Sequence, residues 1–349
     1  MAVDDRGIVV GITTYPNIGP LQGPELDALD FYDWLTSPTG GDVRSTNVQK
    51  IVSSDFQPAL DRPAQEVAQA FDRLQAEAFV SGMPKRLGRR LYVYAAGHGC
   101  ALPFAADPER SDAAFLVADA SKFNATHVMT KVYALYFLNA GIFDEIVVFM
   151  DCCRNLLSLN PNYPSYMNAV SMDTLADEPR KFFAFATRWG LNAREMPFNG
   201  VTRGIFTTAL IAGLKGAAAN PDGTITSSSL RNYLIFHMKD PLTPEQLQDP
   251  EIQKRPDVPP PAVELVFNTV PPPRVTISVT FPPSAGNQLI RLLGDGFKKI
   301  AEGQTVAGAP WVVPEPQPRG GYLVQIPTLG LEKDFTLIGN ERTFDVVLS

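Results

Sequence analysis

The segment Glu145–Asn155, which reads EIVVFMDCCRN, decides how the rest of this chain is interpreted. Its apolar run, Ile146–Met150, is short and unbroken, which is typical of a strand buried on both faces of a parallel sheet. The run ends in an acid, two thiols and a base at residues 151–154. Open α/β sheets bind their ligands at the carboxyl ends of the strands, so these four side chains mark a candidate site.

A second strand of the same kind, Arg90–Ala96, ends in Gly97-His98-Gly99. Cysteine attacks as a thiolate, and a nearby base such as histidine activates it. Glycines on both sides leave the imidazole accessible and let the backbone approach a substrate. We therefore expect the two strand ends to meet, with the backbone N–H groups of Gly99 and Cys153 converging on a developing oxyanion.

The composition of the 349-residue chain, 45% hydrophobic and 19% charged, indicates a globular protein with room for one large and one small domain. Its formal net charge of −7 argues against a nucleic-acid partner. Residues 1–6 lack the pattern of a signal peptide, and no apolar run approaches the roughly 18 residues of a membrane span. These features predict a cytoplasmic protein without a membrane partner.

Three cysteines, two of them adjacent, do not form a disulfide framework, and they favour a reducing compartment. A structural zinc site is the rival explanation for His98, Cys100, Cys152 and Cys153. None of the usual paired-ligand spacings is present, and neighbouring strand residues point to opposite faces. We therefore expect no metal at these residues.

Buried strands alternate with amphipathic helices over residues 1–240, which predicts an α/β fold with a mostly parallel sheet covered by helices. The segment 100–130 is expected to be a long loop, and long loops inside compact domains are usually functional. Serines 227–229 are candidate caps for the last helix. The expected strands are 7–13, 46–52, 91–96, 146–150 and 181–187, and the expected helices are 24–35, 63–80, 130–139, 205–214 and 230–238.

The character of the sequence changes after residue 240. Residues 241–273 are rich in proline and are predicted to form a semi-rigid linker. From residue 274 to residue 349, short alternating runs are separated by turn signals, which is typical of a small β-sandwich domain.

Several segments, in order, resemble the caspase-like cysteine peptidases and are most similar to metacaspases and their bacterial relatives. YAAGHG at 94–99 and DCCRN at 151–155 resemble the two catalytic motifs, and their His98 and Cys153 are 55 positions apart, close to the roughly 50 of caspases. The other matching segments are 11–15, 21–28, 183–187 and 204–210. The resemblance covers about residues 5–240 and implies a caspase-like fold and a bacterial origin.

The resemblance implies a cysteine endopeptidase that acts on protein or peptide substrates, with His98 as the base. In the catalytic motif of the family, Cys153 is at the position of the nucleophile, and Cys152 is at the preceding position, which a small residue occupies. It also places Asp27 and Asp151 in a pocket for the Arg or Lys before the cleaved bond. Two buried carboxylates repel each other unless a cation enters between them. The simpler alternatives are helix-dipole stabilisation by Asp27 and a strand-end hydrogen bond of Asp151.

Other features of the sequence stay open. Many metacaspases need calcium, but the acids Asp107, Glu109, Asp112 and Asp119 do not have the spacing of a calcium site, so no cofactor is expected. Arg154 has no assigned role. A caspase-fold scaffold without proteolytic activity is the alternative function, and the C-terminal β domain is a candidate site for a regulatory partner.

Overall fold

The computed structural model describes residues 4–56, 63–80, 82–102, 112–121, 126–154, 180–187, 192–198, 200–238, 256–271, 274–318, 320–337 and 343–349. The chain divides into two compact units. The first comprises Met1–Ala218 and Ile225–Asn268, and the second comprises Ala219–Thr224 and Thr269–Ser349. Of the predicted linker, residues 241–255 and 272–273 lie outside the described part of the chain.

A five-stranded sheet forms the centre of the first unit, with the strand order β10-β9-β5-β1-β2. Every neighbouring pair in it is parallel. The predicted mostly parallel sheet is therefore confirmed. Its strands are β1 (Arg6–Gly11), β2 (Val48–Val52), β5 (Gly88–Ala96), β9 (Phe143–Asp151) and β10 (Arg180–Phe185).

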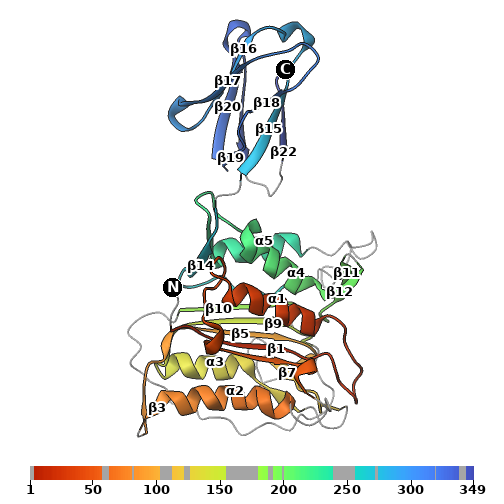
Figure 1. Ribbon diagram of the computed structural model, residues 1–349, viewed down its shortest axis with the longest axis vertical. Helices are drawn as coiled ribbons and strands as arrows, with labels where there is room; N and C mark the ends of the chain where they lie inside the picture. The colour runs from red at the N-terminus through yellow and green to blue at the C-terminus, as the bar shows by residue number, and fades with distance from the viewer. Residues whose placement is uncertain are drawn as a thin grey trace. The chain divides into compact units, whose positions relative to one another are not determined.

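Helices cover both faces of this sheet, as predicted (Figure 1). On one face lie α1 (Pro24–Thr36), α4 (Ile205–Ala212) and α5 (Ser227–His237), and on the other lie α2 (Pro63–Ala78) and α3 (Thr130–Asn139). Because both faces are covered, residues 146–150 of β9 are fully buried, which explains their unbroken apolar run. None of the described helices has the length and apolar character needed to cross a membrane.

Helix α1 buries one of its acids. Asp27 is 1% exposed and lies on the buried side with Phe31 and Trp34, whereas Leu26 is 41% exposed. A buried carboxylate needs compensating partners, because taking it out of water is costly. Asp27 has such partners in Arg203 and Gly204.

The predicted loop at 100–130 instead contains a three-stranded antiparallel sheet, β6-β7-β8, among its described residues. Its apolar members Phe115 and Val128 are buried in the core of the first unit, so long-range packing stabilises strands that local periodicity does not reveal. The cap of α5 also differs from the prediction. It is Thr226, which accepts a hydrogen bond from the backbone of Ser229 in a reciprocal capping box.

The first unit and its boundary with the second also contain several short strands and helical turns. They are η1 (Ser45–Asn47), η2 (Ser53–Asp55), β3 (Phe79–Val80), β4 (Met83–Pro84), β6 (Gly99–Leu102), β7 (Asp112–Leu116), β8 (His127–Val128), β11 (Glu195–Phe198), β12 (Val201–Gly204), η4 (Gly213–Ala217), β13 (Thr224–Thr226) and β14 (Val266–Thr269).

The second unit contains two sheets that share one apolar core, as expected for a β-sandwich. Strands β15 and β20 alternate buried and less buried residues along their length. One sheet joins β15 (Arg274–Thr280), β18 (Trp311–Val312), β19 (Gln317–Pro318) and β22 (Thr343–Val347), and the other joins β16 (Leu289–Leu293), β17 (Lys299–Gln304), β20 (Gly320–Ile326) and β21 (Leu331–Leu337). Strand β22 runs parallel to β15.

A fully buried arginine stabilises the amino-terminal end of the central sheet. Arg90 is 0% exposed and donates hydrogen bonds to Glu145 (2.7 Å) and to the hydroxyl of Tyr92 (2.7 Å). It also donates to the carbonyl of Val266 (3.0 Å), and its guanidinium lies over the ring of Phe267. This one side chain therefore links β5, β9 and the returning strand β14.

Replacing Arg90 with methionine should destabilise the first unit by about 3 kcal/mol or more, because it leaves partners of a buried charge without their donor. The measurement is urea unfolding followed by the helical circular-dichroism signal. Arg86→Met, which breaks an exposed ion pair with Asp144, is the matched control and should cost about 1 kcal/mol or less. Equal effects of the two substitutions would contradict this account of Arg90.

Candidate active site

The pairing of β5 with β9 brings the two predicted catalytic segments together. Ala96 lies opposite Asp151 in the parallel register, and the N–H of Gly97 donates to the carbonyl of Asp151 at 3.1 Å. His98 and Cys153 each follow these paired positions by two residues. Both line one cavity of about 440 Å³, together with Asp27 and Asp151. The other residues around this cavity include Leu21, Pro24, Ala193, Glu195 and Gly204.

The two adjacent cysteines have different environments. Cys152 is 1% exposed and belongs to the apolar core, whereas Cys153 is half-buried and faces the cavity. Burial raises the pKa of the Cys153 thiol, a hydrogen bond from the backbone of Ala193 lowers it, and the charge of Asp151 raises it. Only Cys153 is therefore placed to react with a molecule in the cavity, and it needs a base to do so.

The imidazole of His98 is held by the turn that follows β1. Its Nε2 atom lies 2.9 Å from the carbonyl oxygen of Gly19, and its ring meets the ring of Tyr15 edge to face at 4.6 Å. A carbonyl only accepts hydrogen bonds, so Nε2 carries the proton and the neutral ring keeps Nδ1 as its basic atom. The sequence gives no signal that this turn holds the histidine.

Gly99 lies directly against the nucleophile segment. A β-carbon at Gly99 would be 2.6 Å from Cys152 Sγ and 2.6 Å from the carbonyl oxygen of Cys153, so only glycine allows this approach. Gly99 is the first residue of β6 and stands opposite Phe115 of β7. The backbone amides expected to hold an oxyanion therefore belong to segments in close contact.

The two pocket acids meet at Gly204. A β-carbon there would lie 2.1 Å from Asp151 Oδ2 and 2.9 Å from Asp27 Oδ2. Burial is the main cause that raises the pKa of Asp151 to about 7, and the charge of Asp27 adds to it. Burial also raises the pKa of Asp27 to about 6, although hydrogen bonds from Arg203 and Gly204 oppose the shift.

The hydrogen bonds of these two acids give them different roles. Asp27 uses both oxygens within the chain, accepting from Arg203 Nε at 2.6 Å and from the N–H of Gly204 at 2.8 Å. Asp151 Oδ2 accepts from the backbone and hydroxyl of Thr207, at 3.1 and 2.7 Å. Among the described residues no hydrogen bond reaches Asp151 Oδ1. Arg203 thus supplies a cation to Asp27, whereas Asp151 accepts its hydrogen bonds through Oδ2.

A third acid, Glu195, lines the same cavity and was not predicted from the sequence. Its carboxylate accepts from the backbone N–H groups of Gly23 at 2.7 Å and Gln22 at 3.3 Å, which caps the start of α1. Its charge contributes to the raised pKa of Asp27 and of Cys153. A single acid in an irregular stretch carries no periodic signal, so only the fold reveals its position.

Arg154, which the sequence leaves without a role, fixes the end of the nucleophile segment. It forms an ion pair with Asp257, and its guanidinium stacks on the ring of Phe185 at 4.6 Å. Phe185 and Asp257 also exchange backbone hydrogen bonds of 3.0 Å in both directions. A residue of the predicted linker therefore adds to the edge of β10.

The calcium candidates gain no support from the described residues. Nowhere in that part of the chain do three or more His, Cys, Asp or Glu side chains gather as metal ligands. Asp119 is exposed, while Asp107 and Glu109 lie outside the described residues, as does the side chain of Asp112.

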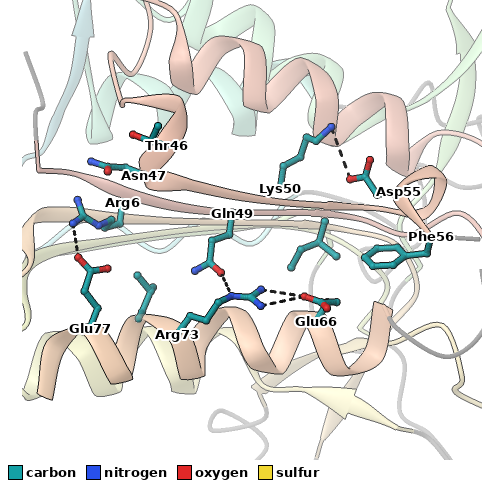
Figure 2. Close-up of a pocket in the computed structure, with 12 residues that line it drawn as sticks. Arg6, Thr46, Asn47, Gln49, Lys50, Asp55, Phe56, Glu66, Arg73 and Glu77 are labelled. Carbon is teal, nitrogen blue, oxygen red and sulfur yellow. Dashed lines mark hydrogen bonds and ion pairs between the residues drawn. The ribbon is translucent and has the colours of Figure 1, made fainter.

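A larger cavity of about 700 Å³ lies between β2 and α2 (Figure 2), and its lining includes no cysteine or histidine. Its charged side chains bind one another. Arg6 pairs with Glu77 at 2.8 Å, and Arg73 contacts both Glu66 at 3.1 Å and Gln49 at 2.6 Å. The smaller cavity is therefore the one with reactive groups.

Comparison with known proteins gives distant relatives. No family model matches the chain. A protein called "Probable protease" from a Desulfuromonadales bacterium is 28% identical over 217 residues, which are 60% of this chain and 26% of that protein. The chain thus spans about a quarter of the length of this relative.

Two solved structures show a distant likeness of fold. Protein GSU0716 from Geobacter sulfurreducens has a TM-score of 0.44 and 17% identity, and the match covers 77% of this chain and 98% of that one. Caspase-1 from Spodoptera frugiperda has a TM-score of 0.46 and 13% identity over 77% of this chain and 91% of that one. These values carry no information on activity.

The described architecture agrees with the fold that the sequence resemblance implies. Five parallel strands form the central sheet, and helices cover both of its faces. The Gly-His-Gly and Asp-Cys-Cys-Arg segments leave adjacent strands at the same edge of the sheet. These features establish the class of fold.

Gly204→Ala should disrupt the acid pair, because the added methyl group would overlap Asp151 Oδ2. The expected loss in the free energy of unfolding is roughly 1–3 kcal/mol, which urea titration measures. Gly321→Ala, where a β-carbon meets nothing within 4 Å, is the matched control and should stay within about 0.5 kcal/mol of the wild type. A neutral effect of Gly204→Ala would show that the two acids do not meet there.

The raised pKa values of Asp27 and Asp151 predict a pH-dependent stability. Each folded-state pKa lies above the ordinary value of 3.8, so the protonated acids stabilise the folded state. This stabilisation is complete below about pH 3.8 and is lost as the pH rises through about 6 and 7. Asp151→Asn should remove much of the fall in unfolding free energy between pH 5 and pH 8, as measured by urea titration at each pH. Asp345→Asn in the second unit is the control. An unchanged pH slope in Asp151→Asn would contradict the assignment.

Proposed function

We propose that the protein is a cysteine endopeptidase in which Cys153 is the nucleophile and His98 is the general base. The observation that carries this proposal is the single cavity lined by both residues, at the carboxyl ends of two paired parallel strands. The relative called a probable protease supports a peptidase activity. The three free cysteines suit a reducing compartment such as a bacterial cytoplasm.

In the proposed reaction, His98 Nδ1 takes the proton of the Cys153 thiol as the sulfur attacks the carbonyl carbon of the substrate. The backbone N–H groups of Gly99 and Cys153 stabilise the oxyanion. The carbon–nitrogen bond then breaks, and His98 returns the proton to the leaving amine. Water, deprotonated by His98, hydrolyses the thioester and releases the free thiol.

A basic side chain is the proposed ligand of the acidic end of the cavity. Asp151 Oδ1 is the acceptor, and the charges of Asp27 and Glu195 add to the attraction, while Arg203 balances part of the charge of Asp27. Entry of a cation favours the ionised form of Asp151, whose pKa is otherwise raised to about 7. The preferred substrate is therefore a protein or peptide with Arg or Lys before the cleaved bond.

A scaffold or binding module without proteolytic activity is the alternative function. The raised pKa of the Cys153 thiol is the observation that favours it, since a protonated thiol is a poor nucleophile. A chloromethyl-ketone or iodoacetamide probe separates the two functions. Labelling of Cys153 that is lost in His98→Ala supports the enzyme, and a thiol that stays inert between pH 6 and pH 9 supports the scaffold.

The central test is hydrolysis of peptides that differ only in having Arg, Lys, Asp or Leu before the cleaved bond. Cleavage after Arg and Lys is expected, and Cys153→Ala should reduce kcat/KM by about 10³-fold or more because the nucleophile is lost. Cys152→Ala is the matched control and should still cleave. A clear preference for Asp would overturn the basic specificity, and full activity of Cys153→Ala would overturn the cysteine mechanism.

A further inference from the structure

The hydroxyl of Tyr15 is inserted into the ladder between β6 and β7. Continuing the register from Gly99 opposite Phe115 places His98 opposite Leu116, and the N–H of Leu116 donates directly to the carbonyl of His98 at 2.9 Å. The second bond expected of this pair, from the N–H of His98 to the carbonyl of Leu116, is replaced by a bridge through the Tyr15 hydroxyl. The N–H of His98 donates to the Tyr15 hydroxyl at 3.0 Å, and that hydroxyl donates to the carbonyl of Leu116 at 3.0 Å.

This bridge changes the position of His98. Residues in a hydrogen-bonded antiparallel pair normally exchange both bonds directly. A hydroxyl between one donor and its acceptor separates the strands on that side only, so the backbone turns at His98. Gly97 makes room for the hydroxyl, because a β-carbon there would lie 2.4 Å from the Tyr15 oxygen, and its φ of 155° favours glycine.

Tyr15 also fixes the imidazole of His98 in two other ways. Its ring contacts the imidazole edge to face, with centroids 4.6 Å apart and an interplanar angle of 71°. Its carbonyl accepts the N–H of Gly19 at 3.1 Å, which closes the turn that presents the Gly19 carbonyl to His98 Nε2 at 2.9 Å. Tyr15 therefore contacts the backbone N–H of His98, packs against its ring, and closes the turn whose Gly19 carbonyl accepts from its Nε2.

The hydroxyl is suited to act as a permanent donor. Tyr15 is 1% exposed, and burial raises the pKa of its phenol well above the ordinary value of 10.0. The hydroxyl therefore stays protonated at neutral pH and continues to donate to Leu116. A water molecule in the same place would exchange, whereas this hydroxyl is covalently fixed to the turn.

We propose that Tyr15 is the positioning residue for His98, which sets the direction of the imidazole and keeps its proton on Nε2. Tyr15 does not touch the substrate; it acts through His98. The kinetic consequence rests on the proposed function, because it requires His98 to act as a base. The effect on the tautomer of His98 does not depend on any activity.

Tyr15→Phe tests the proposal in the full-length protein, since it keeps the ring and removes only the bridging hydroxyl. We expect kcat to fall roughly three- to tenfold, the effect of losing one hydrogen bond, with KM unchanged within about twofold. Tyr322→Phe in the second unit is the matched control, because it also loses a buried hydroxyl that donates to a backbone carbonyl, at 2.6 Å, and it should leave both constants unchanged.

A nitrogen-15 NMR spectrum of the histidine side chains gives a readout that a purely structural role would not change. In the neutral wild-type imidazole the proton should lie on Nε2, and in Tyr15→Phe the two tautomers should mix. Gly19→Ala, which strains the turn at a φ of 96° without a steric clash, should cause the same mixing, and Gly141→Ala, at a φ of 67°, should not.

An unchanged kcat together with a single retained tautomer in Tyr15→Phe would overturn the proposal. A fall in kcat that only follows the fraction of unfolded protein would also overturn it, since the role would then be structural. If the wild type hydrolyses no peptide, the proposed function fails, while the tautomer measurement still decides the role of Tyr15.

Discussion

The rest of the site depends on the parallel pairing of β5 with β9, and in particular on the register that sets Ala96 opposite Asp151. The hydrogen bond from Gly97 to the Asp151 carbonyl continues this register beyond the last strand residue. Because a parallel sheet brings the carboxyl ends of its strands to one edge, a base and a thiol that are 55 positions apart in sequence line the same cavity. A shift of the register by one residue would turn the side chains of one strand to the other face and separate the two groups.

Buried charge is the second constraint. The site holds Asp27, Asp151 and Glu195 in a largely buried region, and each ionised carboxylate needs a partner to offset its desolvation. The hairpin of β11 and β12 supplies much of this compensation: Arg203 and the backbone of Gly204 bind Asp27, and Glu195 of the same hairpin caps α1. The compensation is incomplete at Asp151, whose pKa is raised to about 7. That incomplete compensation is the basis of the basic specificity that we propose.

The periodic parts of the fold were predictable from the sequence. Helix α3 and the central strands follow apolar patterns that local burial imposes, and the observed α3 coincides with the predicted 130–139. The sheet β6-β7-β8 was missed, because its short strands are stabilised by contacts with distant core residues and leave no clear period. At the site, His98, Cys153, Asp27 and Asp151 were chosen from sequence and do line one cavity, whereas Tyr15, Glu195 and Arg203 were not recognised. Each of these three contacts a residue more than 80 positions away in the sequence, and no local pattern records such a contact.

The sequence by itself determined the class of fold, the order of its central strands and main helices, and the chemical types placed at the strand ends. It did so because burial on two faces gives unbroken apolar runs, and because reactive groups follow those runs. The tertiary structure alone decided which oxygens of Asp27 and Asp151 accept hydrogen bonds, which nitrogen of His98 donates to Gly19, and which residues hold these groups in place. The physical reason is that hydrogen bonding and desolvation depend on distances of a few ångströms between segments that only the folded chain brings together.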